Sequence, residues 1–156
     1  AAKMVSDIDN SVRFVYVGSG DMEPFILEKS AELGISDKII FAGFLRGNDV
    51  DQVYKSADVY VLPSVSDPFG ITPLEAMKNN VPCIISRTSG VSEVINHCLK
   101  VDFWDVHQLA SNILSVLRYS SLYSELRNNG FIEVQKLSWK EPAKKCFDIY
   151  RSVANG

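Results

Sequence analysis

Short apolar runs alternate with stretches of helical periodicity along most of the chain. The apolar runs are typical of buried strands, and we expect five of them, at residues 13–17, 38–42, 59–62, 82–85 and 99–101. Helices are expected between them, over residues 21–33, 50–57 and 71–78, where apolar residues recur every three or four positions. Strands that alternate with helices are joined by crossovers, so the pattern predicts an α/β fold with a Rossmann-like, doubly wound parallel sheet.

The last third of the chain is expected to be helical. A capping box at residues 105–108 starts one helix, and a second helix is expected over residues 122–137, interrupted near Gly130. Another capping box at residues 138–141 precedes a third helix. We interpret its apolar stripe of Ala143, Phe147 and Tyr150 as core packing, because a helix in a globular domain buries its apolar face.

The beginning of the chain has the pattern of a helix end. Residues 1–9 lead directly into the first expected strand. A doubly wound unit opens with a strand before such a helix. We therefore expect the chain to be part of a longer protein and to lack at least the first strand of its sheet.

Composition and charge narrow the classes of function. A chain of 156 residues that is 46% hydrophobic and 22% charged fits one globular domain. The net charge of −3, with scattered basic residues, speaks against nucleic-acid binding. No apolar run approaches the roughly 20 residues that span a membrane. Three cysteines without a Cys-x-x-Cys pair indicate reduced, buried thiols of a cytoplasmic protein, and His97 and His107 lack the spacing of metal ligands.

The densest chemical signal is the segment of residues 63–77, which follows an expected strand and opens an expected helix. Thr72 is predicted to cap this helix, with Pro73 at the first helical position and Glu75 at the third. The N–H groups at a helix start favour a phosphate. Asp67 and Glu75 add two carboxylates, which accept hydrogen bonds from sugar hydroxyls. A phosphate site flanked by hydroxyl acceptors is what a nucleotide sugar requires.

Each of these acidic residues also has a structural interpretation. Glu75 taken alone fits a capping box with no ligand. Asp67 taken alone fits an ordinary Asx-type turn before Pro68.

The stretch Ser-Val-Ser-Asp-Pro-Phe-Gly-Ile-Thr-Pro-Leu-Glu-Ala-Met at residues 64–77 resembles the signature of glycosyltransferase family 4. Members of that family are retaining enzymes of the GT-B fold, in which two Rossmann-like domains face each other across a cleft. The resemblance extends over residues 12–153 and includes residues 14–20, 41–45, 54–64, 89–95 and 138–139. Residues 85–104 are similar to the glycogen-synthase-like branch of the family.

The resemblance implies roles for individual residues. Asp67 falls at the first acidic position, which contacts the hydroxyls of the donor sugar, although the family usually has Glu there. Glu75 falls at the second acidic position, which binds the ribose hydroxyls. Backbone amides that meet the sugar and diphosphate are implied at Phe69, Gly70, Ile71 and Thr72, and a loop bordering the nucleobase at Gly43, Phe44, Leu45 and Arg46. The diphosphate-binding Arg and Lys of the family would lie before residue 1.

On this resemblance, residues 1–156 are expected to be a single nucleotide-sugar-binding domain, one half of a GT-B enzyme. The parent would be a cytoplasmic, retaining hexosyltransferase that moves a sugar from a UDP-, GDP- or ADP-sugar to a glycan or polysaccharide. The donor is a substrate, and no metal or cofactor is implied. The expected partner is the N-terminal acceptor domain of the same parent chain, through which the protein could also be peripheral at a membrane. Without that domain the fragment is expected to be inactive.

Two other functions stay open at this point. A non-catalytic module that binds a nucleotide or a partner is favoured by Asp67 in place of Glu. A sugar epimerase of the GT-B fold shares the architecture, but the Pro-Phe-Gly sequence at residues 68–70 speaks against it.

Overall fold

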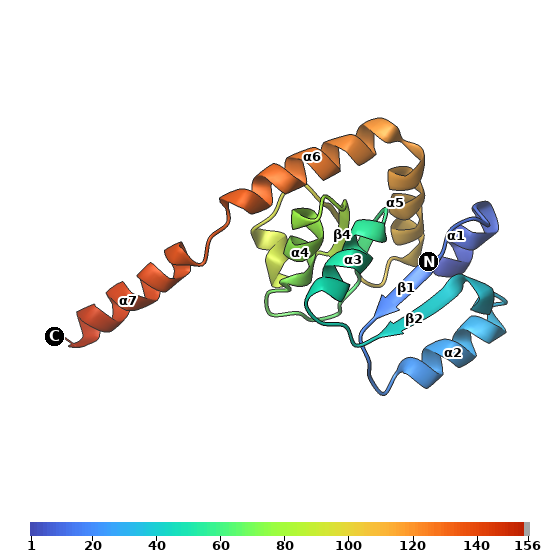
Figure 1. The fold of residues 1–156 in the computed structure, drawn as a ribbon, viewed down its shortest axis with the longest axis horizontal. Helices are drawn as coiled ribbons and strands as arrows, with labels where there is room; N and C mark the ends of the chain where they lie inside the picture. Colours follow the sequence, from blue (N-terminus) through green and yellow to red (C-terminus); the bar gives the residue numbers. More distant parts are fainter. Residues whose placement is uncertain (155–156) are drawn as a thin grey trace.

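The computed structural model describes residues 1–154 and contains five parallel strands (Figure 1). Strand β1 (Phe14–Val17) pairs with β2 (Ile39–Gly43). Strands β3 (Tyr60–Leu62), β4 (Cys83–Ser86) and β5 (Leu99–Val101) form a second parallel sheet in that order. All five predicted strands are present, and their ends differ from the prediction by one residue at most. The α/β class with parallel strands is therefore confirmed.

Helices connect the strands as expected. Helix α1 (Ala2–Ile8) precedes β1, α2 (Glu23–Glu32) follows β1, α3 (Asn48–Ser56) follows β2 and α4 (Thr72–Lys78) follows β3. Two short 3-10 helices, η1 (Ser36–Lys38) and η2 (Gly90–Glu93), precede β2 and follow β4. Helices α5 (Val106–Arg118), α6 (Ser120–Lys136) and α7 (Lys140–Ala154) come after the last strand.

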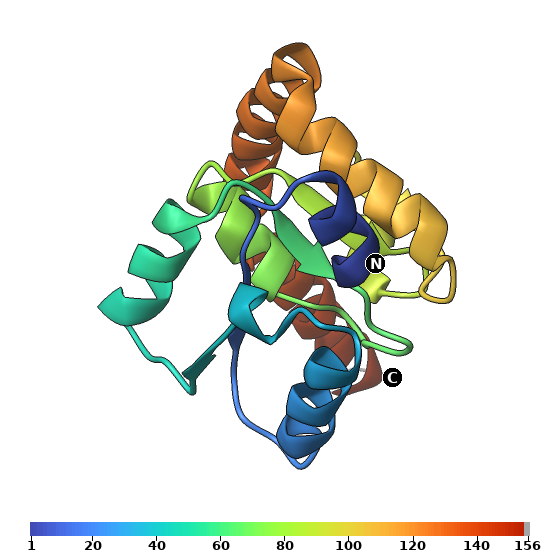
Figure 2. The same ribbon diagram turned by 90° about the vertical axis from the view of Figure 1, so that its right-hand side faces the viewer.

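Strand β4 is buried on both faces, and its alternating side chains divide the core into two clusters. Ile84 packs in one cluster with Val101 of β5 and with apolar residues of α1 and α5. Ile85 packs in the other with Met77 of α4 and Tyr54 of α3. Figure 2 shows α1 and α5 on one side of this sheet and α3 and α4 on the other. A strand covered by helices on both faces is mostly apolar, which explains the apolar run of Cys83, Ile84 and Ile85.

The two sheets are separate. Within residues 1–154, β1 pairs only with β2 and β3 pairs only with β4. The β1 residues Val15, Tyr16 and Val17 remain 40–48% exposed, which is high for strands of a doubly wound sheet. The expectation of one further strand stays a prediction.

Helix α6 is continuous, so the interruption predicted near Gly130 is wrong. Glycine lowers helix stability, but its missing side chain has a packing role here. A Cβ atom at Gly130 would lie 3.1 Å from Cε of Met77 and 3.4 Å from the carbonyl oxygen of His97. Glycine thus allows α6 to lie close against α4 and the loop before β5, although glycine inside a helix costs roughly 1 kcal/mol.

Helix α7 extends away from the rest of the domain (Figure 1). None of its residues is buried, and Phe147 and Tyr150 are 58% and 72% exposed. The prediction that Ala143, Phe147 and Tyr150 pack in the core is therefore wrong. The chain leaves α6 through an extended Leu137, so α7 does not fold back on the sheet. Helical periodicity identifies an apolar face but not what lies against it.

The cysteines follow the prediction only in part. Cys83 and Cys98 are buried free thiols, whereas Cys146 on α7 is an exposed free thiol. Among residues 1–154, no helix has the length and apolarity needed to cross a membrane.

Candidate functional site

The loop between β3 and α4 is held by the turn that follows β4. Asp67 and Ser89 form a parallel bridge outside the sheets, and the N–H of Gly90 donates to the carbonyl oxygen of Asp67 at 3.0 Å. The N–H of Val91 donates to the carbonyl oxygen of Phe69 at 2.6 Å. These backbone contacts extend the β3–β4 pairing beyond the strand ends and fix the shape of the loop.

Asp67 forms the turn that its position before Pro68 predicts. Its Oδ1 accepts a hydrogen bond from the N–H of Phe69 at 3.2 Å, the pattern of an Asx turn. The structural interpretation of Asp67 is therefore present in the molecule. Its half-buried carboxylate still has a second oxygen, and contact of that oxygen with a sugar stays a prediction.

Glycine is required at two positions of this contact. Gly70 has φ +78°, and a Cβ atom there would lie 2.7 Å from Oδ2 of Asp67. A Cβ atom at Gly90 would lie only 2.1 Å from the carbonyl oxygen of Pro68. The two backbone segments can approach this closely only because neither glycine has a side chain.

The capping box predicted for α4 is wrong. The helix begins at Thr72, its N-cap position is Ile71, and no side chain caps it. The hydroxyl of Thr72 instead accepts a hydrogen bond from the Tyr60 hydroxyl at 2.7 Å. Glu75 does not reach back to the helix start, and its Oε2 accepts from the hydroxyl of Tyr54 at 3.3 Å. Two tyrosines from neighbouring elements thus donate to the polar side chains that the capping box would have used, and the N–H groups at the helix start have no side-chain cap.

These two tyrosines were missed by the sequence analysis as site residues. Tyr54 comes from α3 and Tyr60 from β3, and their rings meet edge to face with centroids 5.8 Å apart. Burial raises the pKa of Tyr60 to about 12, and burial also raises the pKa of Tyr54, with a further contribution from the nearby Tyr60 and Glu75. Both phenols therefore keep their proton around neutral pH and act as donors.

The loop after β2 presents an exposed aromatic ring. Phe44 is 65% exposed, and the guanidinium of Arg46 lies 5.1 Å from the centroid of its ring. Gly43 has φ +68° and its carbonyl oxygen accepts from the N–H of Gly18 at 2.8 Å. Residues 18–20 lie in the connection between β1 and α2. Helix α3 begins two residues after Arg46 and carries Tyr54, so it connects this loop to Glu75.

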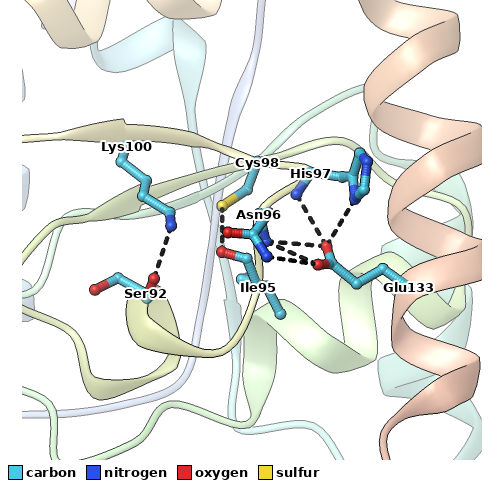
Figure 3. Close-up of polar contacts among 7 residues, drawn as sticks. All are labelled: Ser92, Ile95, Asn96, His97, Cys98, Lys100 and Glu133. Carbon is cyan, nitrogen blue, oxygen red and sulfur yellow. Dashed lines mark hydrogen bonds and ion pairs between the residues drawn. The ribbon is translucent and has the colours of Figure 1, made fainter.

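A carboxylate on α6 fixes the loop between η2 and β5 (Figure 3). Glu133 accepts hydrogen bonds from the backbone N–H and side-chain amide of Asn96 and from the backbone N–H of His97, and it pairs with Nδ1 of His97 at 3.1 Å. Burial alone would raise the pKa of the Glu133 carboxyl, but these hydrogen bonds together hold the pKa below its ordinary value. His97 is half-buried and His107 is exposed.

The expected site residues fall into three groups. The first group lies against the turn at residues 89–91 and consists of Asp67, Phe69 and Gly70. The second lies beside the two tyrosines and consists of Thr72 and Glu75. The third is the loop after β2, with Gly43, Phe44, Leu45 and Arg46. Ile71 lies between the first two groups and is 51% exposed. The Phe69 ring also lies near Trp139, with centroids 6.4 Å apart.

Two surface hollows of the domain lie away from Asp67 and Glu75. A hollow of about 430 Å³ lies between β5 and α5, and one of about 250 Å³ lies between the first sheet and α2; neither is lined by Asp67 or Glu75. Among residues 1–154, no group of three His, Cys, Asp or Glu side chains is placed to hold a metal ion.

The sequence of this chain is similar to a known protein family and to individual relatives. The profile of the family described as "Glycosyl transferases group 1" matches residues 1–132. An uncharacterized glycosyltransferase of Methanocaldococcus jannaschii is 34% identical over 91% of this chain and 37% of its own length. Mannosylfructose-phosphate synthase of Agrobacterium fabrum is 30% identical over 78% of this chain and 28% of its own length. The chain spans well under half the length of these relatives.

Solved structures have the same fold. Sucrose-phosphate synthase from Thermosynechococcus elongatus has a TM-score of 0.80 at 26% identity, over 98% of this chain and 42% of that one. The C-terminal domain of a glycosyl transferase group 1 protein from Francisella tularensis has a TM-score of 0.77 at 24% identity, over 86% and 73% of the chains. Anabaena HepE, in complex with UDP-glucose, has a TM-score of 0.81 at 18% identity, over 97% and 44%.

Replacement of Gly90 should disturb the loop at residues 67–70. In Gly90→Ala the new methyl group would overlap the Pro68 carbonyl oxygen, so the turn and the loop have to separate. We expect a loss of about 1–3 kcal/mol in the free energy of unfolding, measured with urea. Gly20→Ala is the matched control, because a Cβ atom there meets nothing within 4 Å. Equal stability of both variants would contradict this packing.

Replacement of Glu133 should lower stability in a pH-dependent way. At pH 7, Glu133→Gln leaves the donors of Asn96 and His97 with a weaker acceptor, at a cost of about 1–3 kcal/mol. Because the pKa of Glu133 is lowered by folding, its stabilisation is present above the unfolded value of about 4.3 and is lost as the pH falls through the folded pKa. Thermal melts of the wild type and the variant should therefore converge on acidification toward pH 3.

The exposed Glu125 of the same helix provides the control, and Glu125→Gln should leave the melting temperature unchanged across this range. A Glu133→Gln deficit that stays constant down to the most acidic pH would show that the carboxylate charge has no part in holding the loop.

Proposed function

Because this chain belongs to the family of glycosyl transferases group 1, we propose that it is the nucleotide-sugar-binding, C-terminal domain of a glycosyltransferase. The observation that carries the proposal is the placement of Glu75. Its carboxylate is half-buried on the first turn of α4, and it accepts a hydrogen bond from the neutral hydroxyl of Tyr54. Among the ion pairs within residues 1–154, none involves Asp67 or Glu75. Carboxylates without a cation are suited to accept hydrogen bonds from neutral hydroxyl groups.

The three groups of site residues correspond to three parts of a nucleotide sugar. The ring of Phe44, with Arg46 beside it, offers a flat surface for a nucleobase. Glu75 accepts hydrogen bonds from the ribose, and the amides of residues 69–72 meet the diphosphate and sugar. Asp67 accepts from a hydroxyl of the sugar that is transferred. The donor is a UDP-, GDP- or ADP-sugar and enters as a substrate, so no cofactor or metal is part of the proposal.

The acceptor side is proposed to belong to another part of the parent protein. Support comes from the length of this chain, which covers 37% and 28% of the two relatives and 42% of sucrose-phosphate synthase. Further support is that its fold is that of a C-terminal domain of a family member. We propose that an N-terminal domain of the same GT-B protein binds a glycan or polysaccharide acceptor, and that transfer retains the anomeric configuration as in glycosyltransferase family 4.

A second candidate is a domain that binds a nucleotide without turnover. The observation in its favour is that Asp67 is one methylene shorter than the usual Glu and uses Oδ1 for its own turn. A carboxylate shortened in this way reaches a sugar hydroxyl less far. Activity measurements on Asp67 variants distinguish the two candidates.

Nucleotide titration tests the site assignment. We expect UDP, GDP or ADP to shift the amide NMR signals of residues 43–46 and 67–75, and Glu75→Gln to weaken binding about ten- to a hundredfold, as for loss of a hydrogen bond to a charged group. Glu125→Gln changes an exposed carboxylate on α6 and should bind like the wild type. Shifts that cluster away from both loops would contradict the assignment.

Transfer by the full-length parent tests the role of Asp67. Asp67→Asn should lower the rate of transfer about ten- to a hundredfold while the Kd for the nucleoside diphosphate changes little, because Asp67 is assigned to the transferred sugar. Asp67→Glu restores the usual length of the side chain and should be tolerated or change the donor preference. If Asp67→Asn leaves the rate unchanged with every accepted donor, the only role of Asp67 is to form the turn before Pro68. That result would favour the second candidate.

A further inference from the structure

We propose that Tyr54 is a positioning residue for nucleotide recognition, which holds the Glu75 carboxylate in place for the ribose. The inference rests on the proposed function of Glu75 and extends it to a residue of a different element. Tyr54 lies on α3, 21 positions before Glu75, and its hydroxyl is 3.3 Å from Oε2 of Glu75. The same hydroxyl is 3.3 Å from the carbonyl oxygen of Thr72.

The surroundings of Tyr54 fix its hydroxyl. The residue is only 9% exposed and packs in the same cluster as Met77 of α4. Its ring meets the ring of Tyr60 edge to face. The phenol has one proton to donate, and both of its acceptors belong to the first turn of α4. This one proton is shared between the Glu75 carboxylate and the Thr72 carbonyl oxygen, so Tyr54 places Glu75 relative to the backbone of the helix that carries it.

This contact leaves the ligand side of Glu75 available. A carboxylate has about four lone-pair sites, of which the Tyr54 hydroxyl occupies one. Oε1 and the second lone pair of Oε2 can still accept from ribose hydroxyls. A long glutamate side chain otherwise loses rotamer freedom when it binds a ligand, which weakens binding. Tyr54 removes part of that freedom before the nucleotide arrives.

Helix α3 gives Tyr54 a second connection to the proposed site. It begins at Asn48, directly after the loop that carries Phe44 and Arg46, and the N–H of Asp49 donates to the carbonyl oxygen of Arg46 at 3.3 Å. Helix α3 therefore has the loop proposed to contact the nucleobase at its start, and it carries Tyr54, which contacts Glu75, near its end. The inferred result is that base and ribose are recognised at a fixed separation.

Tyr60 differs from Tyr54 in its acceptor. Its hydroxyl donates to Oγ1 of Thr72 at 2.7 Å, and no hydrogen bond joins it to Glu75. Tyr60 therefore supports the start of α4, whereas Tyr54 also contacts the carboxylate that is assigned to the ligand.

The test compares a nucleotide that has ribose hydroxyls with one that lacks them. Calorimetric titration gives the Kd of UDP and of 2′,3′-dideoxy-UDP for the 156-residue chain, with the GDP or ADP pair used instead if that nucleotide binds more tightly. The Kd of the dideoxy nucleotide divided by the Kd of the ordinary nucleotide measures how much the ribose hydroxyls contribute to binding. Because both nucleotides are measured on the same sample, a partly unfolded variant has fewer binding sites but the same ratio.

In the wild type the ratio should be well above one, and Glu75→Gln should bring it close to one. Tyr54→Phe keeps the ring and removes the hydroxyl, so we expect it to lower the ratio about two- to tenfold, the range for one ordinary hydrogen bond. In the Glu75→Gln background, Tyr54→Phe should have no further effect on the ratio. The matched control is Tyr123→Phe, since this half-buried tyrosine of α6 packs in the other core cluster.

The outcomes distinguish an error in the inference about Tyr54 from an error in the proposed function of Glu75. If Glu75→Gln lowers the ratio and Tyr54→Phe leaves it unchanged, the inference about Tyr54 is wrong and the proposed function stands. The same holds if Tyr54→Phe weakens both nucleotides equally, which is the behaviour of a purely structural residue. If the wild type shows no ribose contribution or binds no nucleotide, the assignment of Glu75 fails and the inference fails with it.

Discussion

The shape of the candidate site depends on the close approach of two backbone segments, the loop after β3 and the turn after β4. Gly90 lies so near the Pro68 carbonyl group that no side chain fits between them, and backbone hydrogen bonds from Gly90 and Val91 join the segments. Parallel strands β3 and β4 bring the segments to the same edge of the sheet. The position of Asp67 and the start of α4 follow from this contact, because both belong to the loop that it fixes.

Side chains from other elements also hold the segments around this site in place. Tyr54 and Tyr60 hold the first turn of α4, and Glu133 on α6 holds the loop that leads from η2 into β5. Gly130 lets α6 lie against α4, so the helix that carries Glu133 also packs on the helix that carries Glu75. The residues proposed to contact the ligand are thus positioned by helices as well as by loops.

The sequence predicted the strands well because they are continuous apolar runs with a clear length, such as residues 82–85 around β4. It failed where the answer depends on what lies across the fold. The capping box at Thr72 and Glu75 is a local pattern. In the structure, Thr72 accepts a hydrogen bond from Tyr60, 12 positions earlier, and Glu75 accepts one from Tyr54, 21 positions earlier. Glu133 accepts a hydrogen bond from Asn96, which is 37 positions earlier, and no local sequence pattern predicts such a distant pair. The stripe on α7 was predicted correctly as a helix face and wrongly as core, because periodicity does not identify a partner.

The distribution of thiols over the fold has a practical consequence. Burial raises the pKa of Cys83, and it raises the pKa of Cys98 to about 11, so neither supplies much thiolate at neutral pH. Cys146 is the exposed cysteine of the three and lies on the helix that extends away from the domain. A maleimide dye can therefore be attached at one defined point of the natural sequence. A fluorophore placed there would sense the approach of any second body to α7 without altering the residues around Glu75.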